Sequence, residues 1–306
     1  MHKQSLILVY TRLVLTATFW GGTFIAGRVV AQQVSPFSAA FLRFAVAVVC
    51  LIFLVWKTEG TIPLPRKHHL LPLLLLGMTG IFSYNVFFFR GMRLIEAGRA
   101  ATIIANSPIF IALLSAYFFK ERLTPYKICG ILLSVTGAII VITRGDILEI
   151  FRGSIGRGEL YILGCVASWV TYSLIGKTIM KDLSPLLSVM YSVLIGTAIL
   201  FIPASIEGLF GEIIALPVLS WIGLFYLGFF GTFLAFIWYY QGIKRIGPMK
   251  AGLFINFVPI SGVILAFVIL GEPITPSLLL GVIFVSSGIY LTNKKTAADI
   301  AALQET

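Results

Sequence analysis

The chain has 306 residues, of which 58% are hydrophobic and only 11% are charged. A soluble protein carries about a quarter charged residues, so this composition excludes a water-soluble globular protein and predicts an all-α integral membrane protein. The net charge of +11 does not indicate a nucleic-acid partner, because aromatic residues do not interleave with a basic stripe. The lipid bilayer is the partner that the composition predicts.

Apolar runs long enough to cross a bilayer follow one another along the chain. A spanning helix needs about 20 mainly apolar residues, and Pro, Gly and charge clusters separate the runs. The runs lie at roughly 13–31, 36–56, 70–90, 97–119, 126–143, 159–180, 185–206, 218–241, 249–270 and 276–293. We therefore expect ten transmembrane helices.

The basic residues between the runs indicate the orientation of the chain. The side of the membrane that carries the amino terminus collects 15 Lys and Arg residues, and the other side collects 7. The excess of Lys and Arg belongs on the cytoplasmic side. We expect a multi-pass protein of the cell (inner) membrane with both termini in the cytoplasm.

One sequence pattern occurs twice. Residues 20–36 read WGGTFIAGRVVAQQVSP and residues 169–185 read WVTYSLIGKTIMKDLSP, with Trp, Gly, Ser and Pro recurring 149 residues apart. The pattern continues at an offset of 151 from Gly91 and Gly242 onward. The chain is therefore predicted to consist of two copies of one repeated unit.

The repeat divides the chain into residues 1–150 and residues 151–306, with five expected helices in each half. Because five is odd, the second half enters the membrane from the opposite side and is an inverted copy of the first. Inverted repeats surround a site near the bilayer midplane and permit alternating access. A duplication kept only for stability is the alternative.

Four motifs carry a resemblance to a known family: WGGTFIAGR at 20–28, LRF at 42–44, KERLTP at 120–125 and GEPITP at 271–276. With these motifs the sequence resembles the drug/metabolite transporter superfamily, and in particular its EamA-type ten-helix transporters. The resemblance spans nearly the whole chain. It implies a small-molecule carrier with a central cavity, often an exporter of amino acids or related metabolites. It leaves sugar phosphates, nucleotide sugars and cations open as substrates.

Two prolines at matched positions, Pro108 and Pro259, lie about eleven residues into their helices. A proline inside a helix removes one backbone hydrogen bond and kinks the helix. In hydrocarbon the carbonyl four residues earlier must find another partner, and Asn106, Ser107 and Asn256 lie beside the two breaks. The prolines are candidate hinges, and Asn106 and Asn256 are candidate cavity residues. A packing kink satisfied by a neighbouring Ser or Thr is the alternative.

Arg43 lies about seven residues inside the second run. A charge at the bilayer centre costs about 2.5–3.5 kcal/mol, so Arg43 should face a cavity or extend to the interface. Its fork of donors suits a substrate carboxylate. The alternatives are extension to the outer interface or bonding to carbonyls at a helix end. The matching position in the second half is Ser192, so the charge does not belong to the repeated pattern.

Further aromatic and polar-tipped residues lie at helix-interior depths. Buried Trp and Tyr need partners for N–H and O–H, and ligand sites combine apolar walls with a few polar groups. These residues are candidates for the substrate cavity, with ordinary helix packing as the alternative. The candidates are Trp20, Thr23, Tyr84, Asn85, Trp169, Tyr172 and Trp238.

Matched Glu and Gly residues have structural explanations. Glu121 and Glu272 end the fourth and ninth runs, where we expect each to cap the helix that follows, with a salt bridge at a gate as the alternative. Glycines spaced seven residues apart predict close helix packing. The glycine pairs are Gly130 with Gly137 and Gly281 with Gly288.

The sequence predicts neither a cofactor nor a metal site. The three cysteines have no metal-ligand spacing, and His68 and His69 are expected in a loop. No Asp or Glu lies deep in a run, which argues against a proton relay, and Glu96 at the mouth of the fourth run is the nearest candidate.

Two non-transport functions are alternatives to the carrier. An intramembrane enzyme would need a nucleophile or a metal constellation at depth, and HExxH, GxSxG and a buried Asp pair are all absent from the sequence. We therefore expect no enzyme. A membrane receptor or scaffold is the other alternative. The sequence leaves the substrate, the direction of transport and the oligomeric state open.

Overall fold

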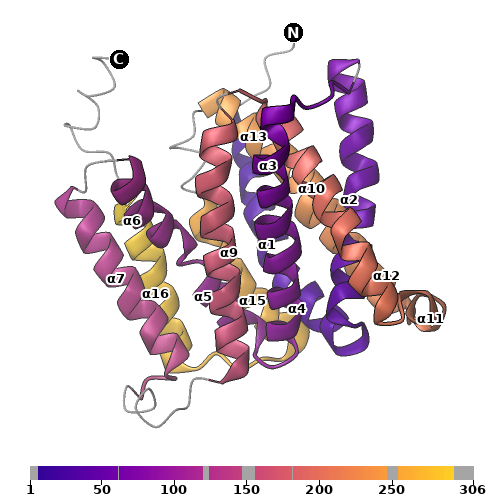
Figure 1. The fold of residues 1–306 in the computed structure, drawn as a ribbon. Helices are drawn as coiled ribbons and strands as arrows, with labels where there is room; N and C mark the ends of the chain where they lie inside the picture. Colours follow the sequence, from indigo (N-terminus) through magenta and orange to yellow (C-terminus); the bar gives the residue numbers. More distant parts are fainter. Residues whose placement is uncertain are drawn as a thin grey trace, which may run out of the picture.

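The computed structural model of the chain describes residues 6–60, 62–119, 124–146, 156–180, 182–246 and 254–292. These residues form helices joined by short connections, with no strand among them (Figure 1). The expectation of an all-α protein is thereby confirmed. The predicted boundary at residue 150, Glu121 and both chain termini lie outside the described residues.

The helices follow the predicted runs closely. The α-helices are α1 (Leu6–Gln33), α2 (Pro36–Glu59), α3 (Lys67–Leu76), α4 (Tyr84–Met92), α5 (Ala97–Ile104), α6 (Ser107–Phe119), α7 (Pro125–Ile142), α9 (Arg157–Ile179), α10 (Pro185–Ile206), α11 (Leu209–Ala215), α12 (Val218–Phe225), α13 (Ala235–Ile246), α15 (Phe257–Leu270) and α16 (Pro276–Thr292). Two π-helical segments, η1 (Gly77–Ser83) and η2 (Tyr226–Leu234), and a 3₁₀ turn, η3 (Phe254–Asn256), complete the set.

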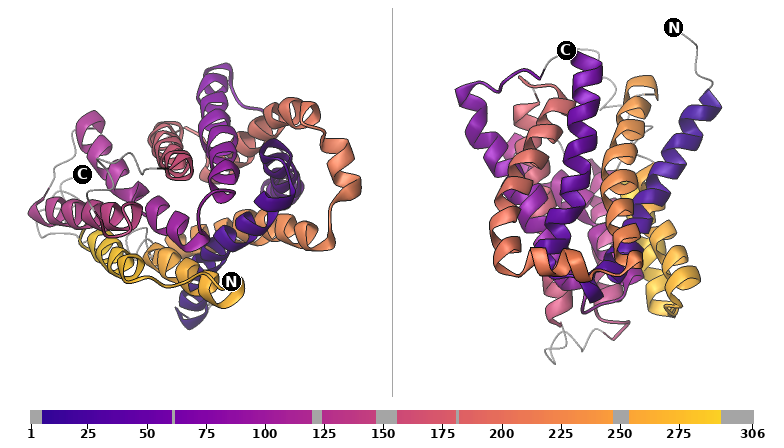
Figure 2. Two further views of the ribbon diagram at one scale, coloured as in Figure 1. Left: turned by 90° about the horizontal axis from the view of Figure 1, so that it is seen from below. Right: turned by 90° about the vertical axis from the view of Figure 1, so that its right-hand side faces the viewer.

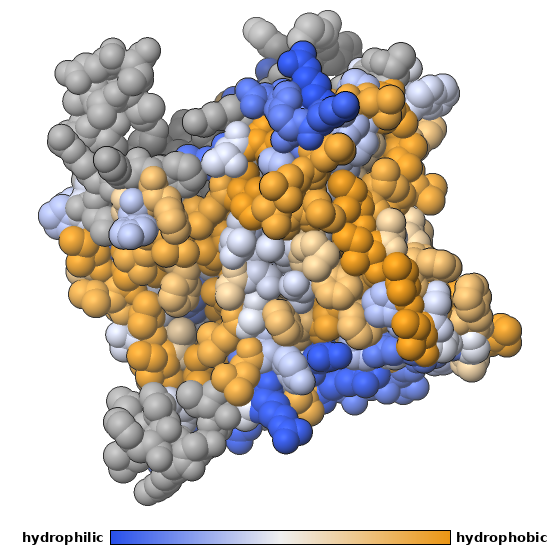
Figure 3. Space-filling view, viewed as in Figure 1, coloured by the Kyte–Doolittle hydropathy of each residue, from blue (hydrophilic) through white to orange (hydrophobic). Residues whose placement is uncertain are grey.

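Eight helical stretches in the described part of the chain are long and apolar enough to cross a membrane. Two further apolar helices, Phe254–Leu270 and Pro276–Thr292, are shorter. The surface shows an apolar belt between hydrophilic patches at its two ends (Figure 3). The chain is therefore a multi-pass membrane protein, while the count of ten spans stays a prediction.

Local sequence signals set several helix ends. Thr124 and Ser184 each precede a proline at the first helical position, and each hydroxyl accepts a hydrogen bond from the backbone N–H three residues on, at 3.4 and 3.3 Å. Gly60 and Gly271 end α2 and α15 with φ of 72° and 69°, a conformation that glycine adopts without steric cost. The helices are thus bounded by local chemistry as well as by hydropathy.

The helices α7 and α16 pack in antiparallel contact through the predicted glycine pairs. A Cβ atom on Gly130 would lie 2.5 Å from the carbonyl oxygen of Gly288, and one on Gly137 would lie 2.9 Å from that of Gly281. Only hydrogen-sized side chains permit this approach of two backbones. Figure 2 shows this pair at one edge of the bundle and α11 and α12 at the opposite edge.

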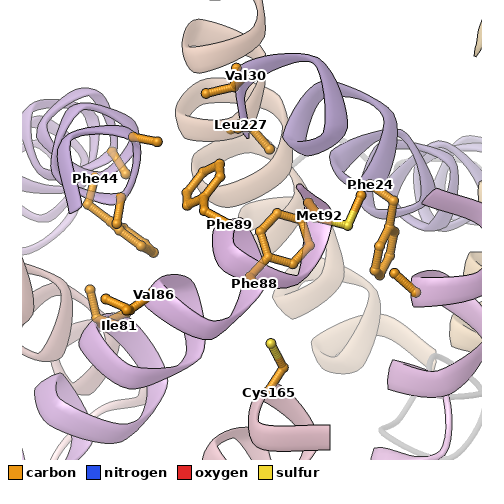
Figure 4. Packing of buried hydrophobic residues seen from close by; sticks show 14 of the residues in the cluster. Phe24, Val30, Phe44, Ile81, Val86, Phe88, Phe89, Met92, Cys165 and Leu227 are labelled. Atoms are coloured by element: carbon orange, nitrogen blue, oxygen red, sulfur yellow. The ribbon is translucent and has the colours of Figure 1, made fainter. Parts of the chain in front are cut away.

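Aromatic side chains fill the core where α1, α4 and α9 meet (Figure 4). The Phe88 ring lies 5.8 Å from the ring of Phe24 and 5.4 Å from that of Phe89. A Cβ atom on Gly27 would lie 2.4 Å from the Phe88 ring, so the glycine of the WGGTFIAGR motif makes room for this core. The side chain of Cys165 is a free thiol that is buried in the same cluster.

The two ends of the bundle are named as they lie in Figure 1. The lower end is where α1 and α4 end and α5 and α9 begin. Arg93 ties this end together, because its side chain donates to the carbonyls of Ala31 and Val34 at 2.6 and 2.7 Å. The upper end is where α1 and α3 begin and α9 ends.

Candidate functional site

Arg43 is held inside the bundle by side chains from two other elements. Its Nη1 donates to Oδ1 of Asn85 in α4 at 2.9 Å, and its Nη2 lies 3.5 Å from Oγ1 of Thr232 in η2. Its Nε is buried, and no described residue forms a hydrogen bond with it. Arg43 forms no ion pair with any acidic residue in the described part of the chain. A guanidinium with unused donors is thus present within a membrane-spanning helix.

The π-helical segments explain why Asn85 and Thr232 face Arg43. A π-helical turn displaces backbone carbonyls from the usual hydrogen-bond register, and such turns occur frequently at functional sites. Thr232 donates to the carbonyl of Leu227, five residues earlier, at 2.9 Å, and Asn85 Nδ2 donates to the carbonyl of Ile81 at 2.9 Å. With its amide N–H groups engaged in this way, Asn85 presents Oδ1 to the guanidinium.

Three of the predicted aromatic residues form one stack between α4 and α9. The ring centroids of Tyr84 and Trp169 lie 5.7 Å apart, and those of Trp169 and Tyr172 lie 5.2 Å apart. The Tyr172 hydroxyl lies 3.5 Å from Oγ of Ser192, the residue that matches Arg43 in the repeat. Tyr84 directly precedes Asn85 in the chain, so the first ring of the stack and the amide that binds Arg43 are carried by the same turn of α4.

Trp20 and Thr23 lie against η2, the segment that also carries Thr232, and Trp238 lies in α13. The Nε1 of Trp20 donates to the carbonyl of Gly231 in η2 at 3.0 Å, and Thr23 donates to the carbonyl of Trp20 at 2.6 Å. The ring of Trp238 stacks on that of Phe19 at 5.6 Å. The polar tips of Trp20 and Thr23 are therefore satisfied by backbone within the protein, the arrangement expected for helix packing.

The chain breaks its fourth run beside Pro108, as the proline predicts. The helix α5 ends at Ile104 and α6 begins at Ser107, and the Ser107 hydroxyl donates to the carbonyl of Ile104 at 2.7 Å. Asn106 is buried here, and its Oδ1 accepts a 2.7 Å hydrogen bond from Ser134 of α7. The carbonyl freed by Pro108 is thus satisfied by a neighbouring serine, and Asn106 joins α5 to α7.

The matched break beside Pro259 is built differently. The turn η3 ends at Asn256, and α15 begins at Phe257 with Pro259 buried in its first turn. The Oδ1 of Asn256 is buried and has no hydrogen-bond partner within the described residues. An unsatisfied buried acceptor costs free energy, so Asn256 is the member of this pair that has capacity for a ligand.

Glu272 caps a different helix from the one that its position in the sequence suggests. Its carboxylate accepts hydrogen bonds from the backbone N–H groups of Ala97 and Gly98 at 2.8 and 3.1 Å, at the start of α5. The prediction that it caps the following helix is wrong, because Thr275 occupies that role, accepting from the N–H of Leu278 at 3.2 Å. A carboxylate stabilises the exposed N–H groups of any helix start that lies within reach.

A buried ion pair lies beside this cap. Arg99 of α5 and Glu159 of α9 are 6% and 5% exposed, and their charged groups lie 3.0 Å apart. Arg99 also donates to the carbonyl of Val141 at the end of α7, at 3.1 Å. Glu96, the carboxylate that the sequence places at the mouth of the fourth run, directly precedes α5. The structure adds Glu159, which is buried and already neutralised by Arg99.

The EamA-like transporter family matches this sequence twice, over residues 7–143 and again over residues 156–294. The chain belongs to the EamA-like transporter family. The expected resemblance is thereby confirmed.

Individual relatives agree with this family. The chain is 30% identical over 281 residues to the uncharacterized transporter YyaM of Bacillus subtilis, with 92% of each chain covered. It is 27% identical over 286 residues to a probable terminal-alkyne amino-acid exporter of Streptantibioticus cattleyicolor, with 93% of each covered. A protein known from a crystal structure aligns with a TM-score of 0.62 at 19% identity, covering 94% of this chain and 98% of the other. That structure supports the fold of this EamA-family chain.

Thr232 was not singled out from the sequence, although it contacts Arg43. The available signal was the glycine spacing in the same run. A Cβ atom on Gly228 would lie 2.6 Å from the carbonyl oxygen of Arg43, and one on Gly231 would lie 2.5 Å from Cγ2 of Thr23. Glycines at such spacing in an apolar run indicate close backbone approach, and the polar residue beside them then faces the neighbouring helices.

Two hollows in the described part of this EamA-family chain are lined by other residues. One of about 420 Å³ lies between α2 and α10 and is lined by apolar residues such as Phe41 and Phe201. The other, of about 340 Å³, lies at the upper end beside His69 and Asp182. None of the predicted cavity residues lines either hollow, so the central cavity stays a prediction.

Proposed function

We propose that this chain is a secondary transporter that moves small polar metabolites, amino acids or closely related compounds, out of the cell by alternating access. The observation that carries the proposal is Arg43. Its guanidinium lies within a membrane-spanning helix, and in the described part of the chain it bonds only to neutral side chains and keeps a buried Nε without a partner. A substrate carboxylate supplies the missing acceptor and the missing negative charge.

The cost of burying Arg43 supports this role. A charged side chain at the bilayer centre is disfavoured by about 2.5–3.5 kcal/mol, and such residues mark substrate or ion pathways. Replacing Arg43 by an apolar residue would remove that cost, so its presence needs a compensating benefit. Substrate recognition is the benefit that we infer, and the name of the S. cattleyicolor relative, an amino-acid exporter, agrees with a carboxylate-bearing substrate.

We further propose that residues 1–150 and 151–306 form two inverted repeats of five helices each. Contacts between matching residues support this arrangement, because a contact made by residues of the two halves recurs when each residue is replaced by its copy in the other half. The backbone of Gly231 packs on Thr23, and the backbone of Gly80, at the matching position, packs on Tyr172. In the repeat Gly130 matches Gly281, and Gly137 matches Gly288. The contact between Gly130 and Gly288 therefore has its counterpart in the contact between Gly281 and Gly137.

The π-helical segments extend this correspondence. The segments η1 (Gly77–Ser83) and η2 (Tyr226–Leu234) occur in matching helices of the two halves. Inverted repeats give a transporter two nearly equivalent conformations, each open to one side of the membrane. With the excess of Lys and Arg toward the upper end, we place that end in the cytoplasm of the cell that carries the protein.

Counterflow in proteoliposomes tests the proposed function. Purified protein is reconstituted into vesicles preloaded with unlabelled amino acids, amino-acid amides, sugar phosphates or organic cations, and uptake of the matching labelled compound is followed. We expect transient accumulation of an amino acid without chemical change, and none of its amide. Accumulation of cations or amides alone would refute the role of the carboxylate, and chemical conversion of the substrate would support the enzyme alternative.

A further inference from the structure

Two histidines and an aspartate meet at the upper end of the bundle. His68 and His69 are expected in a loop from the sequence, but they lie in the first turn of α3. Asp182 lies in the turn between α9 and α10. One ligand atom from each of the three side chains lies within 4.8 Å of the other two. Segments that are far apart in the sequence thus bring together three groups that can each bind a metal ion.

His69 is the informative member of this cluster. It is only 5% exposed, and neither of its ring nitrogens has a hydrogen-bond partner among the residues that the structure describes. A neutral imidazole carries one donor and one acceptor, so burial leaves both unsatisfied at a cost in free energy. The side chain lines the hollow of about 340 Å³ that also borders Asp182. A ligand in this hollow would supply the missing partner.

The chemistry of the three groups favours a transition-metal ion. Imidazole nitrogens and a carboxylate oxygen are the usual ligands of Zn²⁺, and three protein ligands leave one position for water. Asp182 forms no ion pair with a described basic residue, so its charge is available. Arg66 also borders the hollow and would favour an anion, but the Asp182 carboxylate opposes an anion at the same place.

The surrounding backbone holds the site in a defined shape. The Tyr191 hydroxyl of α10 donates to the carbonyl of Pro63 at 2.6 Å, which fastens the segment before α3 onto α10. The N–H of Asp182 donates to the carbonyl of Ile179 at 3.0 Å, which fixes the turn that carries the carboxylate. With the backbone held in this way, rotation of the three side chains is enough to bring their ligand atoms, which lie within 4.8 Å of one another, onto one ion.

We propose that His68, His69 and Asp182 form a binding site for a divalent transition-metal ion, with Zn²⁺ the best match. The ion would join the start of α3 to the α9–α10 turn. Because these segments belong to opposite halves of the chain, a bound ion restrains their relative movement at the upper end. The effect on transport rests on the proposed function, whereas the binding of the metal does not.

Binding is tested first on the full chain in detergent, freed of metal by a chelator. Co²⁺ is titrated in and its visible absorption recorded, because a four-coordinate site absorbs far more strongly than aqueous Co²⁺, and Zn²⁺ is then added as competitor. We expect one ion per chain and a rise in melting temperature with Zn²⁺. The variants Asp182→Asn and His69→Gln should each weaken binding by at least about 100-fold. His2→Ala, which removes the remaining histidine of the chain, serves as the matched control and should bind as the parent does.

The outcomes are decisive in either direction. Asp182 is exposed, so Asp182→Asn tests the site even if His69→Gln folds poorly. Absence of stoichiometric Co²⁺ or Zn²⁺ binding, or equal affinity in Asp182→Asn, would overturn the proposal. Stabilisation by inorganic phosphate without any metal effect would overturn it too and assign the hollow to an anion. Metal binding without a change in counterflow would keep the site and refute only the restraint on transport.

Discussion

Replacing Arg43 by Gln separates a role in substrate binding from a role in folding. The guanidinium is positively charged and can bond a carboxylate through two donors, whereas Gln is neutral and shorter. Hydrogen bonds to charged groups contribute about 1.5–3 kcal/mol, so the apparent KM for the amino acid should rise about 10- to 150-fold. Removal of a buried charge should leave the melting temperature unchanged or raise it.

The assay is counterflow at several substrate concentrations, with melting temperature measured on the same preparations. Arg43→Lys provides the matched comparison, because it keeps the charge and loses the fork of donors, and we expect an intermediate KM. Any residual transport of an amino-acid amide should be insensitive to Arg43→Gln. An unchanged KM for the amino acid in well-folded Arg43→Gln would refute the carboxylate clamp, and a lower melting temperature would indicate a structural role instead.

Other positions give independent expectations. Pro259→Ala should slow counterflow more than it lowers the melting temperature, and unchanged flux in a well-folded variant would remove Pro259 as a hinge. Gly130→Leu should destabilise the protein by about 3 kcal/mol, since its side chain would meet the backbone of α16, whereas Gly211→Leu, with open space around it, should not. Arg99→Gln or Glu159→Gln alone should lower the free energy of unfolding by about 3–5 kcal/mol, measured by thermal unfolding. The double variant should lower it by less than the sum of the two. Additive losses would show that the pair is not coupled.

The helices and their ends could be predicted from the sequence because these features depend on local chemistry. Apolar length, proline after Ser or Thr, and glycine at a helix end act within a few residues. The glycine pairs that join α7 and α16 were also visible, since a spacing of seven places Gly130 and Gly137 on one helix face. These features could be predicted because each depends either on residues nearby in the sequence or, for the glycines, on close packing that does not require a particular partner residue.

The contacts of the candidate site could not be predicted, because they join distant segments. Asn85 and Thr232 lie 42 and 189 residues from Arg43 in the chain. The π-helical segments that aim these two side chains need only a shift of the backbone register, which leaves no mark in composition. Glu272 was assigned to the nearer helix start for the same reason, since local sequence cannot show that α5 comes closer.

The polar groups around Arg43 do not recur in the second half, although the packing contacts do. The position that matches Arg43 is Ser192, which is 0% exposed and donates to the carbonyl of Val189 at 2.9 Å, so a neutral side chain stands where the first half has a guanidinium. Asn85 is likewise replaced by Phe236. A symmetric pair of arginines would favour a dianion, whereas one arginine on one side of the bundle matches a single carboxylate. The asymmetry of these residues therefore favours monocarboxylic amino acids over dicarboxylic ones as substrates within the proposed mechanism.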